Sequence, residues 1–299
     1  MPQPEPQGSA PDTLLLLRPG DEERVDAFLR EHAASSLFLR SNLRAGGLVD
    51  RGQTYQGAWA AAVDRRGIHS VACHAWNGTL LLQAPRDPAV LARFIVTASD
   101  RPIHGLIGPC AQVEIARRAL GLTSAPTKLD SREDLFSLDL AALSVPSNLR
   151  AGHVLCRRSH TRDLASLTVW RKDYEDALFD PPDHRRDHAS TMRRLHDDGW
   201  LFVLTEREAL VAMCAYNAVV PDCVQIGGVW TPPGHRRRGY ARAVVAGALL
   251  AARAAGATTS VLFTHVTNEP AVRAYRALGF EVTGCYALVL FRDGQALEP

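Results

Sequence analysis

Apolar residues recur along the chain with two periods, and the two periods alternate in a similar order in both halves. Short apolar or alternating runs predict strands, whereas apolar residues three or four positions apart predict helices. In the first half, strands are expected at 13–18, 55–63, 69–76, 79–83, 103–107 and 136–140, and helices around 25–29, 37–43, 88–97 and 111–120. In the second half, strands are expected at 153–157, 201–205, 210–215, 224–230, 260–265 and 282–291, and helices at 160–178, 188–196, 240–255 and 269–276.

This repeated order predicts an α/β chain with two domains. The 299 residues are enough for two ordinary cores. We expect a Pro-rich disordered tail at 1–12, a first domain at 13–143, a linker at 144–150 and a second domain at 151–299. The sequence at 116–121 also aligns with that at 274–279, which favours a tandem repeat.

Composition narrows the class of protein. With 46% hydrophobic residues, 22% charged residues and a net charge of +2, the chain is typical of globular proteins and too balanced for a dedicated nucleic-acid binder. The first residues lack the features of a signal peptide, and no apolar run reaches bilayer length. Six scattered cysteines are expected to be reduced and buried, as in a cytoplasmic protein.

The most informative stretch is 224–255, where a strand, a turn and a helix follow one another. The strand must end at Pro232-Pro233, and the helix is expected to begin at Tyr240. The turn between them carries three arginines and Gly239. Because the first amides of a helix have no partner within it, such a turn predicts an anion site. The alternative is an exposed basic loop that caps an ordinary helix.

Other phosphate loops do not fit this turn. A Walker loop needs Lys-Ser or Lys-Thr after its last glycine, and a dinucleotide fingerprint needs three glycines at fixed positions. Instead, Arg236-x-x-Gly239-x-Ala241 resembles motif A of the GNAT superfamily of acyl-CoA N-acyltransferases. The pattern Asn268-x-x-Ala271-x-x-x-Tyr275 resembles motif B of that family. The resemblance covers residues 200–291.

The resemblance implies a fold and a cofactor site. It implies two tandem GNAT-like domains, each with a mixed, mostly antiparallel sheet flanked by helices. It implies acetyl-CoA as co-substrate, with its diphosphate on the amides around 237–242 and its pantetheine arm along the strand before the turn. The cofactor-binding residues implied are Val229, Trp230, Thr231, Arg236, Arg237, Arg238, Gly239, Tyr240, Ala241, Arg242 and Asn268.

The resemblance also implies that Tyr275 is the general acid that protonates the leaving thiolate, since a phenol with an ordinary pKa near 10 is protonated at neutral pH. The structural alternative is a core tyrosine on a helix that Asn268 caps. The base is not evident: His265 is a candidate, although it could equally be a polar residue at the end of a strand. Glu175 and Tyr174 are weaker candidates, and a chain of water molecules that relays the proton is a further alternative. Residues expected to line the acceptor pocket are Trp170, Tyr174 and Glu175.

We therefore expect an N-acetyltransferase acting on a small-molecule amine or a protein amino group, as a monomer or homodimer, without nucleic-acid or membrane partners. The alternative is a non-catalytic acyl-CoA-binding regulatory protein. No metal is expected, because His184 and His188 lack the glutamate of a helical zinc motif. The first domain lacks the phosphate loop, so we expect a degenerate copy that serves structure or acceptor recognition.

Overall fold

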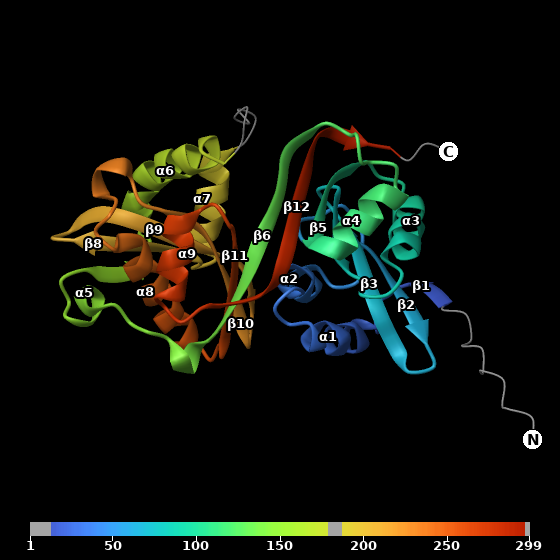
Figure 1. Cartoon of the computed structure of the whole chain (residues 1–299), viewed down its shortest axis with the longest axis horizontal. Coiled ribbons are helices and arrows are strands. Elements are labelled where there is room, and N and C mark those ends of the chain that lie inside the picture. The colour runs from blue at the N-terminus through green and yellow to red at the C-terminus, as the bar shows by residue number, and fades with distance from the viewer. Residues whose placement is uncertain (1–12, 179–186, 297–299) are drawn as a thin grey trace, which may run out of the picture. The chain divides into compact units, whose positions relative to one another are not determined.

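The computed structural model describes residues 13–178 and 187–296 of the chain (Figure 1). These residues form two compact units. The first unit contains the described residues up to Pro126 and those from Leu290 onward, and the second unit is Thr127–Val289. The tail predicted at 1–12 lies outside the described residues.

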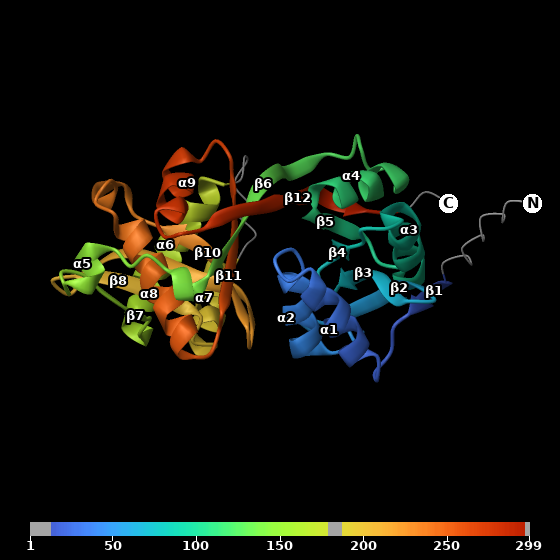
Figure 2. The same cartoon turned by 60° about the horizontal axis from the view of Figure 1, so that its bottom comes forward.

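The first unit is a sheet with helices on both faces. Its strands lie in the order β1-β2-β3-β4-β5, followed by the end of β12. Helices α1 and α2 pack on one face through a core that includes Trp59 and Val71, whereas α3 packs against β2 and β3 from the other face (Figure 2). The elements are β1 (Thr13–Leu16), α1 (Glu22–Glu31), α2 (Leu37–Gly46), β2 (Gly57–Asp64), β3 (Gly67–Ala75), β4 (Thr79–Gln83), α3 (Pro88–Ser99), β5 (Ile103–Pro109) and α4 (Cys110–Ala119).

The second unit repeats this plan. Its strands lie in the order β12-β6-β11-β10-β9-β8-β7. Among the pairings whose register is known, β10 and β11 run parallel and the others antiparallel. The elements are β6 (Thr127–Asp139), a 3₁₀ turn η1 (Leu140–Ala142), α5 (Ser147–Arg150), β7 (Leu155–Arg158), η2 (Thr161–Asp163), α6 (Leu164–Asp176), α7 (His188–Asp197), β8 (Leu201–Glu206), β9 (Ala209–Val220), β10 (Cys223–Trp230), η3 (Pro233–His235), α8 (Tyr240–Ala254), β11 (Thr259–His265), α9 (Glu269–Arg276) and β12 (Glu281–Gln295).

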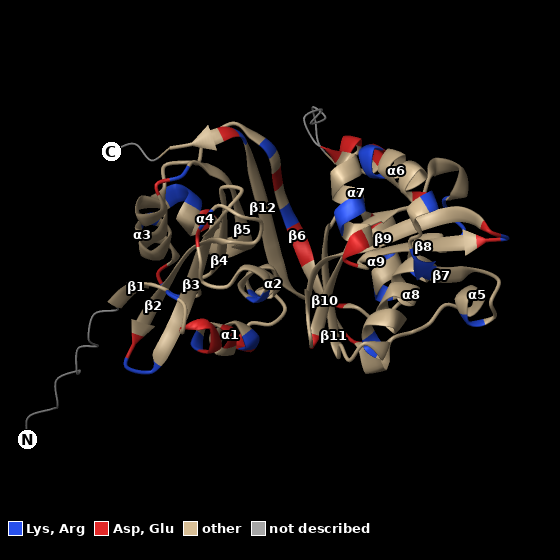
Figure 3. Ribbon diagram, turned by 180° about the vertical axis from the view of Figure 1, so that it is seen from behind, with Lys and Arg blue, Asp and Glu red and all other residues tan. Residues whose placement is uncertain are grey.

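Strand β6 is the main departure from the predicted domain organisation. The sequence pattern placed a closing strand at 136–140 in the first domain and a linker at 144–150. In the structure, β6 pairs antiparallel with β11 of the second unit, from Glu133 opposite His265 to Asp139 opposite Thr259. The residues after it belong to the second unit as well, where Leu138, Leu140 and Leu143 are part of the core. Several charged residues lie along β6 (Figure 3).

The physical reason is that a strand's own pattern shows which of its faces is buried but not which sheet it joins. Strand β6, from the first half of the sequence, completes the sheet of the second unit beside β11. The end of β12, from the second half, lies beside β5 in the first unit. The boundary therefore falls at Pro126 and not at the predicted linker.

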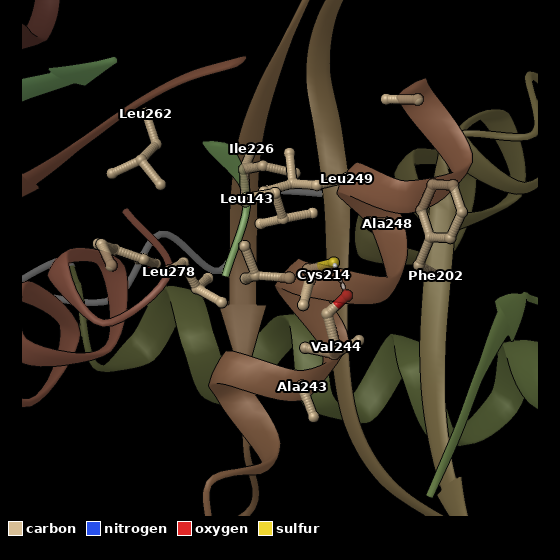
Figure 4. Packing of buried hydrophobic residues seen from close by; sticks show 14 of the residues in the cluster. Leu143, Phe202, Cys214, Ile226, Ala243, Val244, Ala248, Leu249, Leu262 and Leu278 are labelled. Atoms are coloured by element: carbon tan, nitrogen blue, oxygen red, sulfur yellow. Dashed lines mark hydrogen bonds between the residues drawn. The ribbon is translucent and has the colours of Figure 1, made fainter. Parts of the chain in front are cut away.

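The sheet of the second unit is buried on both faces, since the residues of β8 from Leu201 to Thr205 are all buried. Phe202 and Leu204 face the core formed with α8, whereas Leu201 and Val203 face α6 and α7. In the first of these cores, the Cys214 thiol donates to the Val244 carbonyl at 3.6 Å (Figure 4). Helix α8 packs tightly because it is rich in alanine, and its buried side chains include Leu249.

The cysteines do not all have the predicted state. Among the described residues, Cys73, Cys156, Cys214 and Cys223 are free. Cys110 and Cys285 are disulfide-bonded, so the prediction of six reduced thiols is wrong for these two. Sequence spacing could not show this, because a disulfide depends on proximity in the fold. No helix among the described residues is long and apolar enough to span a membrane.

Candidate active site

Strands β10 and β11 separate partway along their length. They pair in parallel only from Cys223 opposite Thr259 to Gln225 opposite Val261. Beyond Gln225, β10 continues to Trp230 beside β9 without a partner on the β11 side. The unpaired edge of β10 can therefore hydrogen-bond to an extended ligand, as a further strand would.

A bulge lies in the separated part of β10. Between the pairs Gly227–Ala215 and Trp230–Met213, Gly228 and Val229 together oppose a single residue of β9. Gly228 has φ +56°, in the left-handed region that glycine adopts without strain. Bulges redirect backbone groups and are frequent beside active sites.

The turn after β10 forms a cradle of backbone amides at the start of α8. Gly239, at the N-cap, has φ +77°, and Arg237 has φ +64°, which is unusual for a residue with a side chain. The first helical hydrogen bond runs from Ala243 N to Gly239 O at 3.0 Å. The amides of Tyr240, Ala241 and Arg242 therefore have no carbonyl partner in the helix, and the helix dipole favours an anion beside them.

Four buried polar atoms around this turn have no hydrogen-bond partner among the described residues. They are Trp230 Nε1, Thr231 Oγ1, His235 Nδ1 and Arg242 Nε. Since buried polar groups are nearly always hydrogen-bonded, this cluster indicates a place that a polar ligand completes. Two of these atoms are donors only, the indole and guanidinium nitrogens, and they suit the phosphate and amide oxygens of an acyl-CoA.

These features open onto one cleft of about 770 Å³ within the second unit. It lies between the separated strands, the turn and helix α9. Its lining residues are Tyr174, Ile226, Gly227, Gly228, Val229, Trp230, Thr231, His235, Arg236, Arg237, Gly239, Tyr240, Ala241, Arg242, Phe263, Thr264, Asn268, Pro270, Ala271, Arg273, Ala274 and Tyr275. Most residues implied by motifs A and B are therefore brought together in one cleft.

The two motif B residues lie at opposite ends of α9. Asn268 caps the helix, since its side chain accepts from Ala271 N at 3.4 Å, and its amide nitrogen donates to Thr264 Oγ1 at 3.3 Å. The capping alternative thus describes what Asn268 does in the structure, although the residue also lines the cleft. Tyr275 is 8% exposed and packs edge-on against Phe136 and Phe280.

Burial raises the pKa of Tyr275 well above its ordinary value, and the nearby Tyr174, Cys214 and Glu133 raise it further. The phenol is thus neutral at any physiological pH. Its hydroxyl makes no hydrogen bond within the described part of the chain. A neutral hydroxyl at the wall of the cleft, with no protein partner, is free to donate its proton to a ligand.

Four predicted site residues do not line the cleft. Arg238 is exposed in the turn. His265 is exposed at the end of β11, where its Nδ1 lies 2.6 Å from Thr267 Oγ1. Trp170, on α6, is partly buried and packs against the core that α6 and α7 form with the sheet. Glu175 is buried in an ion pair with Arg171, at 2.6 Å. Of the residues expected to line an acceptor pocket, only Tyr174 does so, with its ring edge-on to Trp230.

Sequence reasoning missed several lining residues on β10 and β11. Gly227 and Gly228 could have been found, because two adjacent glycines inside a strand pattern indicate a bulge. Phe263 and Thr264 carry no comparable signal, since an apolar strand does not show where its neighbour departs. No group of three or more metal-ligating side chains occurs in the described ranges. Of the rejected zinc pair, His184 lies outside the described residues.

Comparison with known proteins agrees with this geometry. Residues 164–280 match the family model described as the acetyltransferase (GNAT) family. This stretch contains α6 to α9 and every lining residue of the cleft. The second unit therefore carries a GNAT acetyltransferase domain, and the protein is an acyltransferase that moves an acyl group from an acyl-CoA to an acceptor. No curated protein matches the chain significantly.

Solved structures extend the likeness to both halves. A Drosophila protein superposes with a TM-score of 0.67 at 13% identity, over 94% of this chain and 99% of its own. A GCN5-related N-acetyltransferase from Sphaerobacter thermophilus superposes with a TM-score of 0.57 at 14% identity, over 96% of this chain and 98% of its own. A tandem GNAT protein from the clavulanic acid biosynthesis pathway superposes with a TM-score of 0.52 at 12% identity, over 93% of this chain and 98% of its own. At such identities the likeness concerns the fold, which is that of two tandem GNAT-like domains.

Proposed function

We propose that the second unit transfers an acetyl group from acetyl-CoA to a primary amine by direct attack of the amine on the thioester. The observation that carries this proposal is the separation of β10 from β11 beside the amide cradle at the start of α8. One cleft thus offers an anion site, an open strand edge and a neutral phenol.

Each group has a role in this reaction. The amides of Tyr240 to Arg242 and the Arg242 guanidinium hold the diphosphate. The free edge of β10 bonds the pantetheine arm, and the Val229 amide at the bulge donates to the thioester oxygen, where negative charge develops. Tyr275 gives its proton to the sulfur as the carbon–sulfur bond breaks.

A second function has one observation in its favour. None of the described residues that line the cleft is an aspartate or glutamate. A protein with the cradle but without a base would bind acyl-CoA as a regulator and not turn it over. Thiol release from acetyl-CoA, measured with glycine, spermidine, glucosamine and a short peptide as acceptors, separates the two functions. Tight binding without thiol release from any of these mixtures would favour the regulator.

We further propose that the first unit does not bind acyl-CoA. In the corresponding place, after β4, helix α3 begins with Asp87 at its N-cap and Pro88 in its first turn. The carboxylate of Asp87 opposes an anion, and Pro88 has no amide hydrogen to donate. We therefore expect one acyl-CoA site per chain.

A further inference from the structure

Among the described residues, the lining of the cleft includes a proton donor but no carboxylate to accept a proton. An alkyl amine is mostly protonated at neutral pH, and even the neutral amine must lose a proton as it becomes an amide. Solvent or a nearby protein group has to accept this proton, and the one imidazole among the described lining residues, that of His235, belongs to the turn assigned to the diphosphate. The two central strands of the second half offer only Gln225 and His265 for this role by sequence, and the structure places His265 outside the cleft.

Strand β6 brings a carboxylate to this place from the first half of the chain. Glu133 lies directly opposite His265, and Leu135 lies opposite Phe263. Directly opposed residues of antiparallel strands share a face of the sheet. Glu133 is therefore on the same face as Phe263, a lining residue of the cleft, and is its diagonal neighbour across the two strands.

Glu133 is buried without a cationic partner. Its exposed fraction is 7%. Its Oε1 accepts a hydrogen bond from the Ser131 hydroxyl, two residues earlier on the same face of β6. Within the described ranges, no lysine or arginine forms an ion pair with it. Burial of an unpaired carboxylate is costly, so a purely structural role explains this residue poorly.

The effect of Glu133 on two tyrosines agrees with the position that the β6–β11 pairing gives it. Burial is the main cause that raises the pKa of Tyr174, and Glu133 raises that pKa further. Glu133 also contributes to the raised pKa of Tyr275. Both phenols line the cleft, one from α6 and one from α9. Neither hydroxyl hydrogen-bonds to Glu133 in the described structure, so a water molecule can lie between the carboxylate and a ligand.

We propose that Glu133 accepts, through one bridging water, the proton that the acceptor amine loses during acyl transfer. This inference rests on the proposed acetyl transfer. As the nitrogen–carbon bond forms, an amine proton passes to the water and a water proton passes to Glu133. The carbon–sulfur bond then breaks with its electron pair on sulfur, and Tyr275 protonates the thiolate. Return of the proton from Glu133 to the Tyr275 phenolate through solvent restores both groups.

The test compares three full-length variants with the wild type, using an amine that the wild type acetylates. Glu133→Gln keeps the shape and removes the base. Glu133→Asp keeps a carboxylate on a shorter side chain. Asp139→Asn is the matched control, because it removes an exposed negative charge from the far end of the same strand, opposite Thr259, which does not line the cleft. Thermal unfolding and acetyl-CoA calorimetry verify that each variant folds and binds the donor.

At about pH 7, Glu133→Gln should lower kcat by about 10²- to 10³-fold, with the KM for acetyl-CoA changed less than about twofold. Near pH 10 the difference should shrink to about tenfold or less, since solvent then deprotonates an amine with an ordinary pKa. Glu133→Asp should recover part of the rate, and Asp139→Asn should match the wild type. The described titratable groups linked to Glu133, by strand pairing or by its effect on their pKa, are His265, Tyr174 and Tyr275, and all variants retain them.

The outcomes are distinguishable. Wild-type kcat in Glu133→Gln, or a deficit that is equal at every pH, overturns the role of Glu133 and leaves the proposed function intact. If the wild type releases no thiol with any amine, the proposed function fails and this role with it. Should Glu133→Gln not fold, Glu133→Asp carries the test: its kcat must fall at an unchanged KM for acetyl-CoA, and an unchanged kcat refutes the proposal.

Discussion

The Tyr275 hydroxyl gives the sharpest test of the proposed chemistry. Replacement of Tyr275 by Phe removes one oxygen atom from the wall of the cleft and keeps the ring. The ring contacts, with centroids 6.3 Å from Phe136 and 6.1 Å from Phe280, can persist. Since the hydroxyl bonds no group in the described part of the chain, its removal leaves no protein atom without a partner. We expect the free energy of unfolding to change by less than about 1 kcal/mol.

The effect on the rate should be much larger. A positioned general acid contributes about 10²- to 10⁴-fold, which corresponds to about 2.7 to 5.4 kcal/mol of transition-state stabilisation. Burial holds the pKa of Tyr275 well above its ordinary value, so the wild-type phenol remains a proton donor throughout the neutral range. Its ionisation should not limit the wild-type rate between about pH 7 and pH 9.

The assay measures thiol release from acetyl-CoA with a saturating amine, alongside calorimetry of CoA binding. Tyr275→Phe should lower kcat by at least about 10²-fold, and the Kd for CoA should change less than about threefold. Turnover at the wild-type rate would show that Tyr275 is only a core residue. A parallel loss of CoA affinity and rate would show that the hydroxyl binds the cofactor, and this would contradict a role confined to proton transfer.

Three further predictions concern the cradle, the core and the buried phenols. Arg242→Ala should weaken CoA binding by about 10- to 100-fold, because a charge-assisted hydrogen bond to the diphosphate is lost. Pantetheine, which lacks the diphosphate, should bind equally to the wild type and the variant in calorimetry. An equal loss of affinity for both ligands would contradict this prediction. Leu249→Ala should cost about 2–5 kcal/mol in urea unfolding because Leu249 is fully buried, whereas Leu155→Ala, at a 62% exposed side chain, should cost less than about 0.5 kcal/mol. Burial raises the pKa of Tyr216, so this phenol stays neutral in the folded state at a pH where it ionises in the unfolded chain. The free energy of unfolding should therefore be constant below about pH 9 and fall as the pH rises above about 10. A free energy of unfolding that increases above about pH 10 would contradict this prediction.

Many helices and strands of this fold could be predicted, because each of them depends mainly on the sequence within a few residues. Alternation and helical spacing predicted most strands and helices, and the residues from Arg236 to Ala241 predicted the cradle. The proline pair after Trp230 marked the end of β10 correctly. Each of these signals depends on neighbours a few positions apart in the chain.

What the sequence did not show depends on distant partners. The pattern of β6 shows a strand, yet its pairing with β11 is set by the whole second sheet. The same holds for Glu133, whose burial and neighbours follow from that pairing. The bonded state of Cys110 likewise depends on proximity in the fold. Separation of β10 from β11 after Gln225, which opens the cleft, has only the adjacent glycines as a local sign.

The central claim is that the amides at the start of α8 hold the diphosphate of an acyl-CoA, and calorimetry of CoA binding tests it most directly. The comparison is between the wild type and Gly239→Val, since a β-branched residue at φ +77° is strained and its side chain extends into the cradle. The account predicts one site per chain in the wild type and at least about a tenfold weaker Kd in Gly239→Val. Two equal sites, or wild-type affinity in the variant, would contradict it.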